Sequence, residues 1–127
     1  MSELAANVPR FVVVAPLGRD ADLISGFLNG SGYPTICVRH VREVEAEDCA
    51  MLLGLVLTDE ALLRSGLDAV KRIVHSQPVW SDLPVILLTS SAMEPACAAL
   101  ASQARIEVRS LILLERPIRK EMLLRAI

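Results

Sequence analysis

Residues 84–91 read PVILLTSS, and residues 111–127 read LILLERPIRKEMLLRAI. Each stretch contains a run of apolar residues and then turns polar, which is the pattern of a short strand covered on both faces. The first run ends at Thr89, and the second ends at a basic residue before a proline, Arg116-Pro117, where a helical pattern begins. The two stretches predict neighbouring strands of a parallel sheet, followed by a last helix.

Three more apolar runs precede these two strands, and helical patterns separate successive runs. Crossovers of helical length require parallel pairing and right-handed βαβ units. The sequence therefore predicts a flavodoxin-like, doubly wound α/β fold with strand order 2-1-3-4-5, and a capping box over Ser65–Asp68 for the helix after the third strand. The expected strands are Phe11–Ala15, Thr35–Val38, Met51–Thr58, Pro84–Thr89 and Arg109–Leu114, and the expected helical stretches are Asp20–Asn29, Val41–Cys49, Ser65 to before Pro78, Pro95–Gln103 and from Pro117 onward.

Composition and charge fit one cytoplasmic domain over residues 1–127. Hydrophobic residues make up 53% of the chain, but no apolar run approaches the roughly 18 residues of a membrane-spanning helix. The N-terminus has no basic segment followed by an apolar core, so we expect no secretory signal. A net charge of −2 and a pI near 5.7 argue against a nucleic-acid surface, which needs clustered cations. The basic residues near the C-terminus interleave with glutamates, so we expect a solvated face of mixed charge.

No sequence pattern predicts a metal, a cofactor or an enzyme active site. The 3 cysteines form no CxxC pair, and His40 and His75 have no partner at ligand spacing, so we expect surface or helix-cap histidines. A phosphate-binding loop is also missing, because Pro16-Leu17-Gly18 holds a single glycine in place of the GxGxxG set. We therefore expect no catalytic residue in this domain.

Polar side chains gather at the carboxyl ends of the predicted strands, where doubly wound sheets place their functional groups. Asp59 follows the third strand, Thr89 ends the fourth, and Arg116 follows the fifth. The first strand differs, because it runs into Ala15 and Pro16, neither of which has a side-chain oxygen. A site at this edge would therefore hold a carboxylate, a hydroxyl and a guanidinium, with no polar group from the first strand.

Four phrases of the sequence together resemble a known family. They are APLGRDADLI at residues 15–24, LVLTDEALL at 55–63, QPVWSDLPVILLTSS at 77–91 and LILLERPIRKEMLLRAI at 111–127. In this combination the chain is similar to the pseudo-receiver domain at the N-terminus of bacterial hybrid sensor histidine kinases, from Phe11 to its last residue. The resemblance implies the CheY-like form of the flavodoxin-like fold, a three-layer α/β/α sandwich, and a place in two-component phosphorelay signalling.

The resemblance also gives each strand end a role for comparison. A working response-regulator receiver has an aspartate nucleophile on strand three, carboxylates after strand one that hold magnesium, a hydroxyl on strand four and a lysine on strand five. Here Asp59 falls at or one residue beyond the nucleophile position, which leaves Thr58 as the alternative occupant. Thr89 matches the hydroxyl, whereas Arg116 replaces the lysine and Ala15-Pro16 replaces the carboxylates. These positions predict a vestigial phosphoacceptor pocket without a metal site.

Other positions bear on this pocket. Asp20 lies downstream of the first strand, where we expect a helix N-cap, so it is not expected to restore the metal site. Arg19 is a candidate substitute for the positive charge of the metal, and either Arg19 or Arg116 is a candidate ion-pair partner that locks Asp59. Leu113 stands at the receiver's aromatic switch position, where we expect a buried aliphatic side chain that cannot report on phosphorylation.

Together these features predict a regulatory, non-enzymatic module that acts without standard phosphorylation. The expected partners are proteins, either the kinase core of the same chain or another two-component protein, with a homodimer through the last helix as a further option; no nucleic-acid or membrane partner is expected. The last helix has no stop signal, so we expect an N-terminal piece of a longer signalling protein. Two alternatives stay open: an unorthodox receiver phosphorylated on Asp59, and a flavodoxin-like small-ligand binder.

Overall fold

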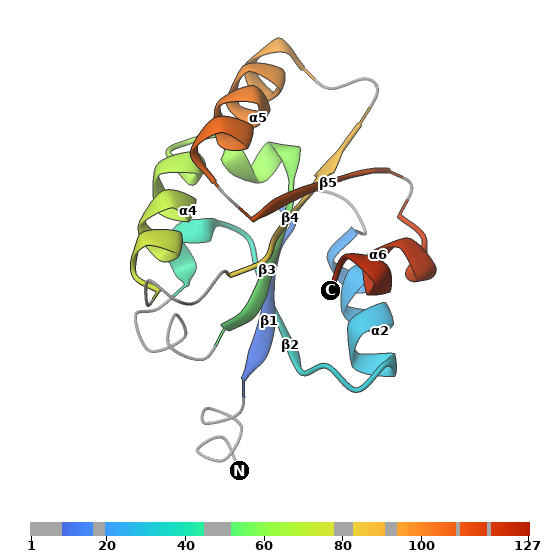
Figure 1. Cartoon of the computed structure of the whole chain (residues 1–127). Helices are drawn as coiled ribbons and strands as arrows, with labels where there is room; N and C mark the ends of the chain where they lie inside the picture. Colours follow the sequence, from blue (N-terminus) through green and yellow to red (C-terminus); the bar gives the residue numbers. More distant parts are fainter. Residues whose placement is uncertain are drawn as a thin grey trace.

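The computed structural model describes residues 9–16, 20–44, 52–77, 83–90, 94–108, 110–116 and 118–127. Its strands pair in parallel in one sheet of order β2-β1-β3-β4-β5 (Figure 1). This order confirms the predicted 2-1-3-4-5 sheet, and the strand bounds lie close to those expected. The strands are β1 (Arg10–Val14), β2 (Thr35–Val38), β3 (Leu52–Thr58), β4 (Val85–Thr89) and β5 (Leu111–Glu115).

Helices cover both faces of the sheet and complete the expected three-layer α/β/α sandwich. Figure 1 shows α2 and α6 on one side of the sheet, and α4 and α5 on the other. No described helix is long and apolar enough to cross a membrane. The helices are α2 (Asp20–Gly30), α4 (Gly66–His75), α5 (Pro95–Glu107) and α6 (Lys120–Ala126), with short 3-10 helices η1 (Val41–Glu43) and η2 (Asp59–Leu62).

Alternating side chains of the central strands form two apolar cores. In β1, Val12 and Val14 belong to the core under α4 and α5, while Phe11 and Val13 belong to the core under α2 and α6. All of these side chains are at most 1% exposed. Because both faces of a parallel sheet are buried, its strands read as continuous apolar runs in the sequence. Polar side chains of the sheet can then gather only where the strands end.

The structure corrects the expected start of α4. Ser65 does precede the helix, but its φ of 68° is left-handed and its side chain makes no capping hydrogen bond. An N-cap side chain usually reaches the N–H two or three residues ahead from an extended backbone, so the predicted capping box is wrong. A capping box occurs instead at His40, whose ring accepts from the Arg42 N–H while Glu43 accepts from the His40 N–H. His40 therefore has the cap role, which is one of the two roles expected for it.

Other helical expectations meet the structure only in part. Of the stretch Val41–Cys49, the structure describes η1 and Val44, and the remainder lies outside the described residues, as does Pro117. α5 continues past the expected end at Gln103 to Glu107, and α6 begins at Lys120.

The predicted burial of Leu113 is wrong, because this residue is 39% exposed. β5 is an edge strand that pairs with β4 along one side. α5 packs chiefly against η2 and leaves the Leu113 side of β5 open. The residue at this position therefore lies at the surface and contributes little to the core.

Gly66, the first residue of α4, provides a test of the packing below the strand ends. A Cβ on Gly66 would overlap the carbonyl oxygen of Ala61 in η2, a backbone atom that cannot rotate away. Gly66→Ala should therefore lower the free energy of unfolding by about 1–3 kcal/mol, the usual cost of overpacking. Gly26→Ala in α2 is the matched control, because a Cβ there meets nothing within 4 Å. Helix propensity should make the control more stable by about 0.5–1 kcal/mol. Urea unfolding measures both effects, and equal changes would contradict this description.

Candidate functional site

The carboxyl ends of β3 and β5 bring Asp59 and Arg116 together. Asp59 begins η2 directly after β3 and is 1% exposed, while Arg116 follows β5. The Arg116 backbone N–H donates to the Thr89 carbonyl at 2.8 Å, which fixes Arg116 against the end of β4. Its Nη2 then donates to Asp59 Oδ1 at 2.5 Å. The structure thus has the Arg116–Asp59 pair; the other candidate partner, Arg19, lies outside the described residues.

Two more carboxylates complete what we call the Arg116 cluster, which consists of Arg116, Asp20, Asp59 and Glu60. Arg116 Nη1 donates to Asp20 Oδ2 at 2.9 Å, and Nη2 also donates to Glu60 Oε2 at 3.0 Å. Asp20 comes from the first turn of α2, and Glu60 comes from η2. Segments far apart in the sequence therefore converge on one guanidinium, whose planar set of donors suits several carboxylates at once.

Asp20 and Glu60 are the members of the cluster that sequence reasoning does not place at Arg116. Asp20, expected at a helix N-cap, is the first residue of α2 with its carboxylate on Arg116. Glu60 directly follows Asp59, and along an extended strand the two side chains would point to opposite faces. The η2 turn instead brings both carboxylates to the same nitrogen. The signal that could have found Glu60 is the adjacent acidic pair itself, at a strand end where a cation is expected.

The other predicted site residues lie near the cluster. Thr58 ends β3 and is fully buried, and Ala15 packs in the core under α2 and α6. The Thr89 hydroxyl donates across to the Leu114 carbonyl on β5 at 3.5 Å. Among the described residues of the predicted site, side-chain hydrogen bonds join only Asp59 and Arg116 to each other.

Burial and crowding set the protonation of the cluster. Burial raises the pKa of Asp59, and the adjacent Glu60 raises it further, against the lowering effect of Arg116. Burial also acts upward on Glu60, but hydrogen bonds with Asp59 and Arg116 outweigh it and lower the pKa of Glu60. Asp59 Oδ2 and Glu60 Oε1 are both buried without a hydrogen-bond partner among the described residues. One proton held by Asp59 would supply a donor for this carboxyl pair.

A cleft of about 640 Å³ opens beside the Arg116 cluster. Asp59, Glu60 and Pro16 line it, together with basic residues from the segment after β2 and the loop before α4. Cys97, from the first turn of α5, lines it as well. Burial raises the pKa of the Cys97 thiol, and the charges of Asp59 and Glu60 act in the same direction. A protonated thiol is a weak nucleophile, so the cleft is suited to binding rather than to cysteine chemistry.

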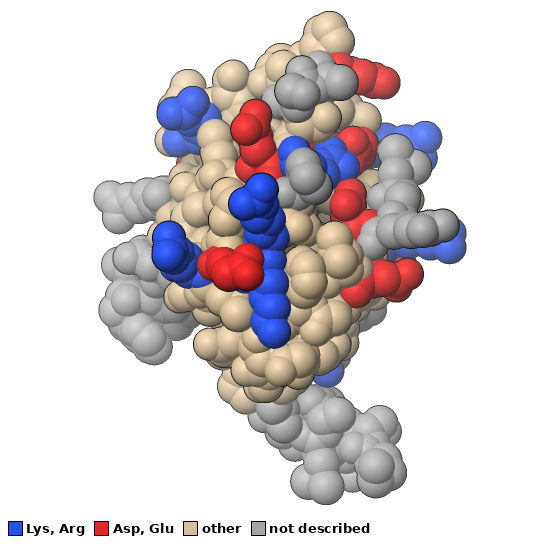
Figure 2. All heavy atoms as spheres, turned by 90° about the vertical axis from the view of Figure 1, so that its right-hand side faces the viewer, with Lys and Arg blue, Asp and Glu red and all other residues tan. Residues whose placement is uncertain are grey.

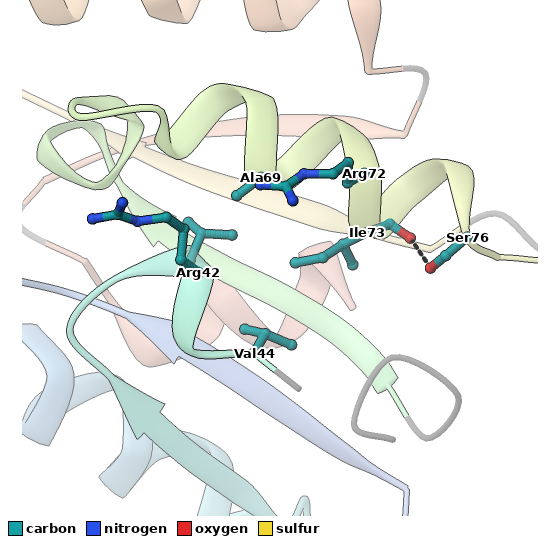
Figure 3. Close-up of a pocket in the computed structure, with 7 residues that line it drawn as sticks. Arg42, Val44, Ala69, Arg72, Ile73 and Ser76 are labelled. Atoms are coloured by element: carbon teal, nitrogen blue, oxygen red, sulfur yellow. Dashed lines mark hydrogen bonds between the residues drawn. The ribbon is translucent and has the colours of Figure 1, made fainter. Parts of the chain in front are cut away.

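A smaller pocket of about 400 Å³ lies between η1 and α4 (Figure 3), and Arg42 borders both it and the cleft. The Ser76 hydroxyl at one side of it donates to the Ile73 carbonyl at 2.7 Å. No carboxylate, thiol or imidazole is among its described lining residues, so it offers little for chemistry. These residues are Val41, Arg42, Val44, Ala69, Arg72, Ile73 and Ser76.

Surface charge near the C-terminus is mixed, as the sequence predicts. Arg119, Lys120, Glu121 and Arg125 are all exposed on or beside α6. Figure 2 shows the side of the molecule that carries α6 and α2, where Lys and Arg side chains lie among Asp and Glu. Cations and carboxylates therefore share this face.

The residues at the strand ends do not fit a magnesium ion of the receiver kind. Ala15 and Pro16 offer no side-chain oxygen after β1. The three carboxylates of the Arg116 cluster already surround a guanidinium. Within the described ranges, no group of three or more His, Cys, Asp or Glu residues could hold a metal ion. Arg116 supplies the positive charge at this point.

Comparison with known proteins identifies the fold. No protein-family model matches the chain, and no curated protein matches it in sequence. A solved response regulator receiver domain protein from Clostridium thermocellum matches with a TM-score of 0.73 at 19% identity, over 94% of this chain and 90% of that one. The chain has the fold of a receiver domain.

Other receiver proteins agree with this assignment. The chemotaxis protein CheY4 of Vibrio cholerae matches the receiver-fold domain with a TM-score of 0.64 at 18% identity, over 93% of this chain and 94% of that one. A response regulator protein from Burkholderia multivorans matches with a TM-score of 0.67 at 15% identity, over 93% of this chain and 90% of that one. The TM-scores establish the receiver fold. At identities this low they establish nothing further, so the chemistry has to be argued from the pocket itself.

The raised pKa of Asp59 predicts how the stability of the receiver-fold domain depends on pH. The folded domain holds this proton more tightly than the unfolded chain, whose aspartates titrate near pH 3.9. The Asp59 contribution to stability should therefore fall as pH rises from about 3.9 to the raised folded value. Asp59→Asn keeps the shape of the side chain, puts an amide in place of the protonated acid and removes this loss. Relative to the wild type, the variant should gain unfolding free energy as pH rises above about 3.9, until the raised folded pKa is passed, measured by urea unfolding.

Asp20→Asn is the matched control for this experiment. It removes a carboxylate from the Nη1 side of Arg116 and leaves the Asp59–Glu60 pair in place. Its unfolding free energy should follow the wild-type pH trend. If Asp59→Asn instead loses stability at neutral pH, Asp59 is an ionised partner of Arg116 and the shared proton is absent.

Arg116 should be among the side chains that contribute most to stability. Arg116→Met leaves three crowded carboxylates without their counter-charge, so it should lower the free energy of unfolding by about 3 kcal/mol, the scale for breaking a buried ion pair. Arg116→Lys should lower it less, because the charge remains but the planar donor fork is lost. Arg125→Met, at an exposed position of α6, should change it by no more than about 0.5 kcal/mol. Guanidinium chloride unfolding ranks the variants, and an equal ranking of Arg116 and Arg125 would refute the expectation.

Proposed function

We propose that this receiver-fold domain is a non-catalytic regulatory module of a bacterial two-component signalling protein, and that it works without phosphorylation of Asp59. The observation that carries the proposal is the Arg116 cluster. Asp59, the candidate phosphoacceptor, is paired with the protein's own cation. Its raised pKa means that Asp59 holds its proton to a higher pH than an ordinary aspartate, and the protonated acid is a poorer nucleophile than a carboxylate.

Electrostatics support the same conclusion. Phosphoryl transfer spreads negative charge over the transferred group, and a metal ion normally offsets that charge. Ala15 and Pro16 provide no ligand for such an ion. Glu60 adds a second carboxylate beside Asp59, which would repel the incoming group. The pocket is therefore suited to keeping its own charged side chains together and poorly suited to accepting a phosphoryl group.

The last helix offers a surface for a protein partner. Leu123 is fully buried against the sheet, whereas Met122 and Ile127 are 41% and 39% exposed. α6 thus covers the core on one side and exposes Met122, and Ile127 follows directly after its last residue. The partner we propose is the kinase core of a cytoplasmic hybrid sensor histidine kinase, or another two-component protein, with self-association through α6 as a further mode.

A second function, phosphorylation of Asp59, has one observation in its favour. Asp59 lies at the end of β3 in a receiver fold, and the 640 Å³ cleft beside it could admit a small phosphodonor. In that case Arg116 would have to leave the carboxylate and bind the phosphoryl oxygens.

Intact-mass spectrometry after incubation with acetyl phosphate and Mg²⁺ distinguishes the two functions. We expect no phosphoryl adduct on the wild-type chain, as on Asp59→Ala, because no ligand set recruits the metal. An adduct on the wild type that is absent from Asp59→Ala would refute the proposal and make Asp59 an acceptor.

A restored variant is the positive control. Ala15→Asp, Pro16→Asp and Arg116→Lys together return the acidic pair and the lysine of a working receiver. We expect this triple variant, once shown to be folded by circular dichroism, to gain an adduct that depends on Mg²⁺. A folded triple variant that stays unmodified would show that these positions are not what prevents phosphorylation.

A further inference from the structure

The cleft beside the Arg116 cluster has a basic side that the proposed function does not use. Arg39 and Arg42 come from the segment after β2, and Arg64 comes from the loop between η2 and α4. All of them line the cleft, and none forms an ion pair within the described part of the chain. Arginines from two separate segments thus line one concave surface, an arrangement that suits an oxyanion, and Arg42 also borders the smaller pocket beside α4.

His40 holds two of these arginines in place. Its Nδ1 accepts from the Arg42 backbone N–H at 3.0 Å and from the Arg42 Nε–H at 3.3 Å. Its Nε2 must then carry the proton, and it donates to the Arg64 carbonyl at 3.0 Å. Arg42 is thereby oriented through Nε, which leaves its terminal amino groups for another partner. In Figure 3 its side chain extends from η1 towards the loop that precedes α4.

The backbone at Arg64 is an independent sign of a functional site. Arg64 and Ser65 have φ angles of 55° and 68°, a left-handed conformation that residues other than glycine rarely adopt. Strained backbone of this kind clusters at ligand-binding sites, where the surroundings hold it in place. A glycine at position 64 would relieve the strain, yet the chain has an arginine that lines the cleft.

We propose that this cleft binds a small phosphate ester, with the phosphate group on Arg42 and Arg64. Its volume of about 640 Å³ is larger than a free phosphate ion needs and falls within the range of about 300–1,000 Å³ typical of small-molecule sites. Ala61 and Leu63 also line it and provide apolar surface for the organic part. The cleft lies at the carboxyl ends of the strands around β1, where the strand order reverses and doubly wound sheets bind their ligands.

Carboxylates elsewhere in the cleft orient such a ligand. Asp59 and Glu60 are paired with Arg116, and Glu94 lies at the start of α5. An anion is repelled from these groups and attracted to the arginines, so the phosphate has one favoured end of the cleft. This inference rests on the proposed function in one respect, since a bound ester would give a phosphorylation-independent module its input.

Isothermal titration calorimetry of the chain tests the inference with adenosine monophosphate, glucose 6-phosphate and inorganic phosphate. We expect at least one ester to bind with a Kd below about 1 mM and more tightly than inorganic phosphate. Arg42→Ala and Arg64→Gly should each raise that Kd at least about tenfold, through the loss of charge-assisted hydrogen bonds. Arg125→Ala, an exposed arginine of α6 that does not line the cleft, should leave the Kd unchanged.

Arg64→Gly separates binding from structure, because it relieves the left-handed arginine and should raise Tm while affinity falls. The inference is overturned if no probe binds, if inorganic phosphate binds as tightly as the esters, or if Arg125→Ala weakens binding as much as Arg42→Ala. Preference between the two esters distinguishes a nucleotide from a sugar phosphate as the source. The acetyl phosphate experiment reports a covalent adduct on Asp59, so either proposal can fail without the other.

Discussion

A single guanidinium pairs with three acidic side chains that the fold brings to one point. Burying a charge without a partner costs several kcal/mol, and Asp59 is 1% exposed. The charge pairing in the pocket therefore depends on Arg116. For the Arg116 side chain to reach the end of β3, β5 must end directly before it. The same requirement explains the local geometry, because η2 turns Glu60 onto Arg116 Nη2 and α2 begins where Asp20 meets Nη1.

A side-chain cation differs from a metal ion in what it allows a pocket to do. A magnesium ion keeps exchangeable waters and can bring a phosphoryl group with it. Arg116 is covalently attached and always charged, and it has no open coordination position to offer. Its donors are already directed at Asp20, Asp59 and Glu60. The receiver scaffold is thus retained around a centre whose charge comes from the chain itself.

The fold could be predicted from the sequence because buried parallel strands record their burial directly as apolar runs. Asp59 and Arg116 could be predicted as site residues for a related reason, since parallel strand ends share one edge of the sheet. Glu60 could not, because its position depends on a 3-10 turn that reverses the expected alternation. The exposure of Leu113 and the left-handed Ser65 depend on how α5 and η2 pack, which no local pattern encodes.

The partners in the Arg116 cluster are separated by as many as 96 positions along the chain. Contacts of such long range form late, since a large loop must close before they contribute. During synthesis the acidic members leave the ribosome first, and their counter-charge follows only with the last strand. Asp59 can therefore pair with Arg116 only after β5 has been synthesised and has docked on β4. The last strand thus completes the charge pairing of a pocket whose other members all precede it in the chain.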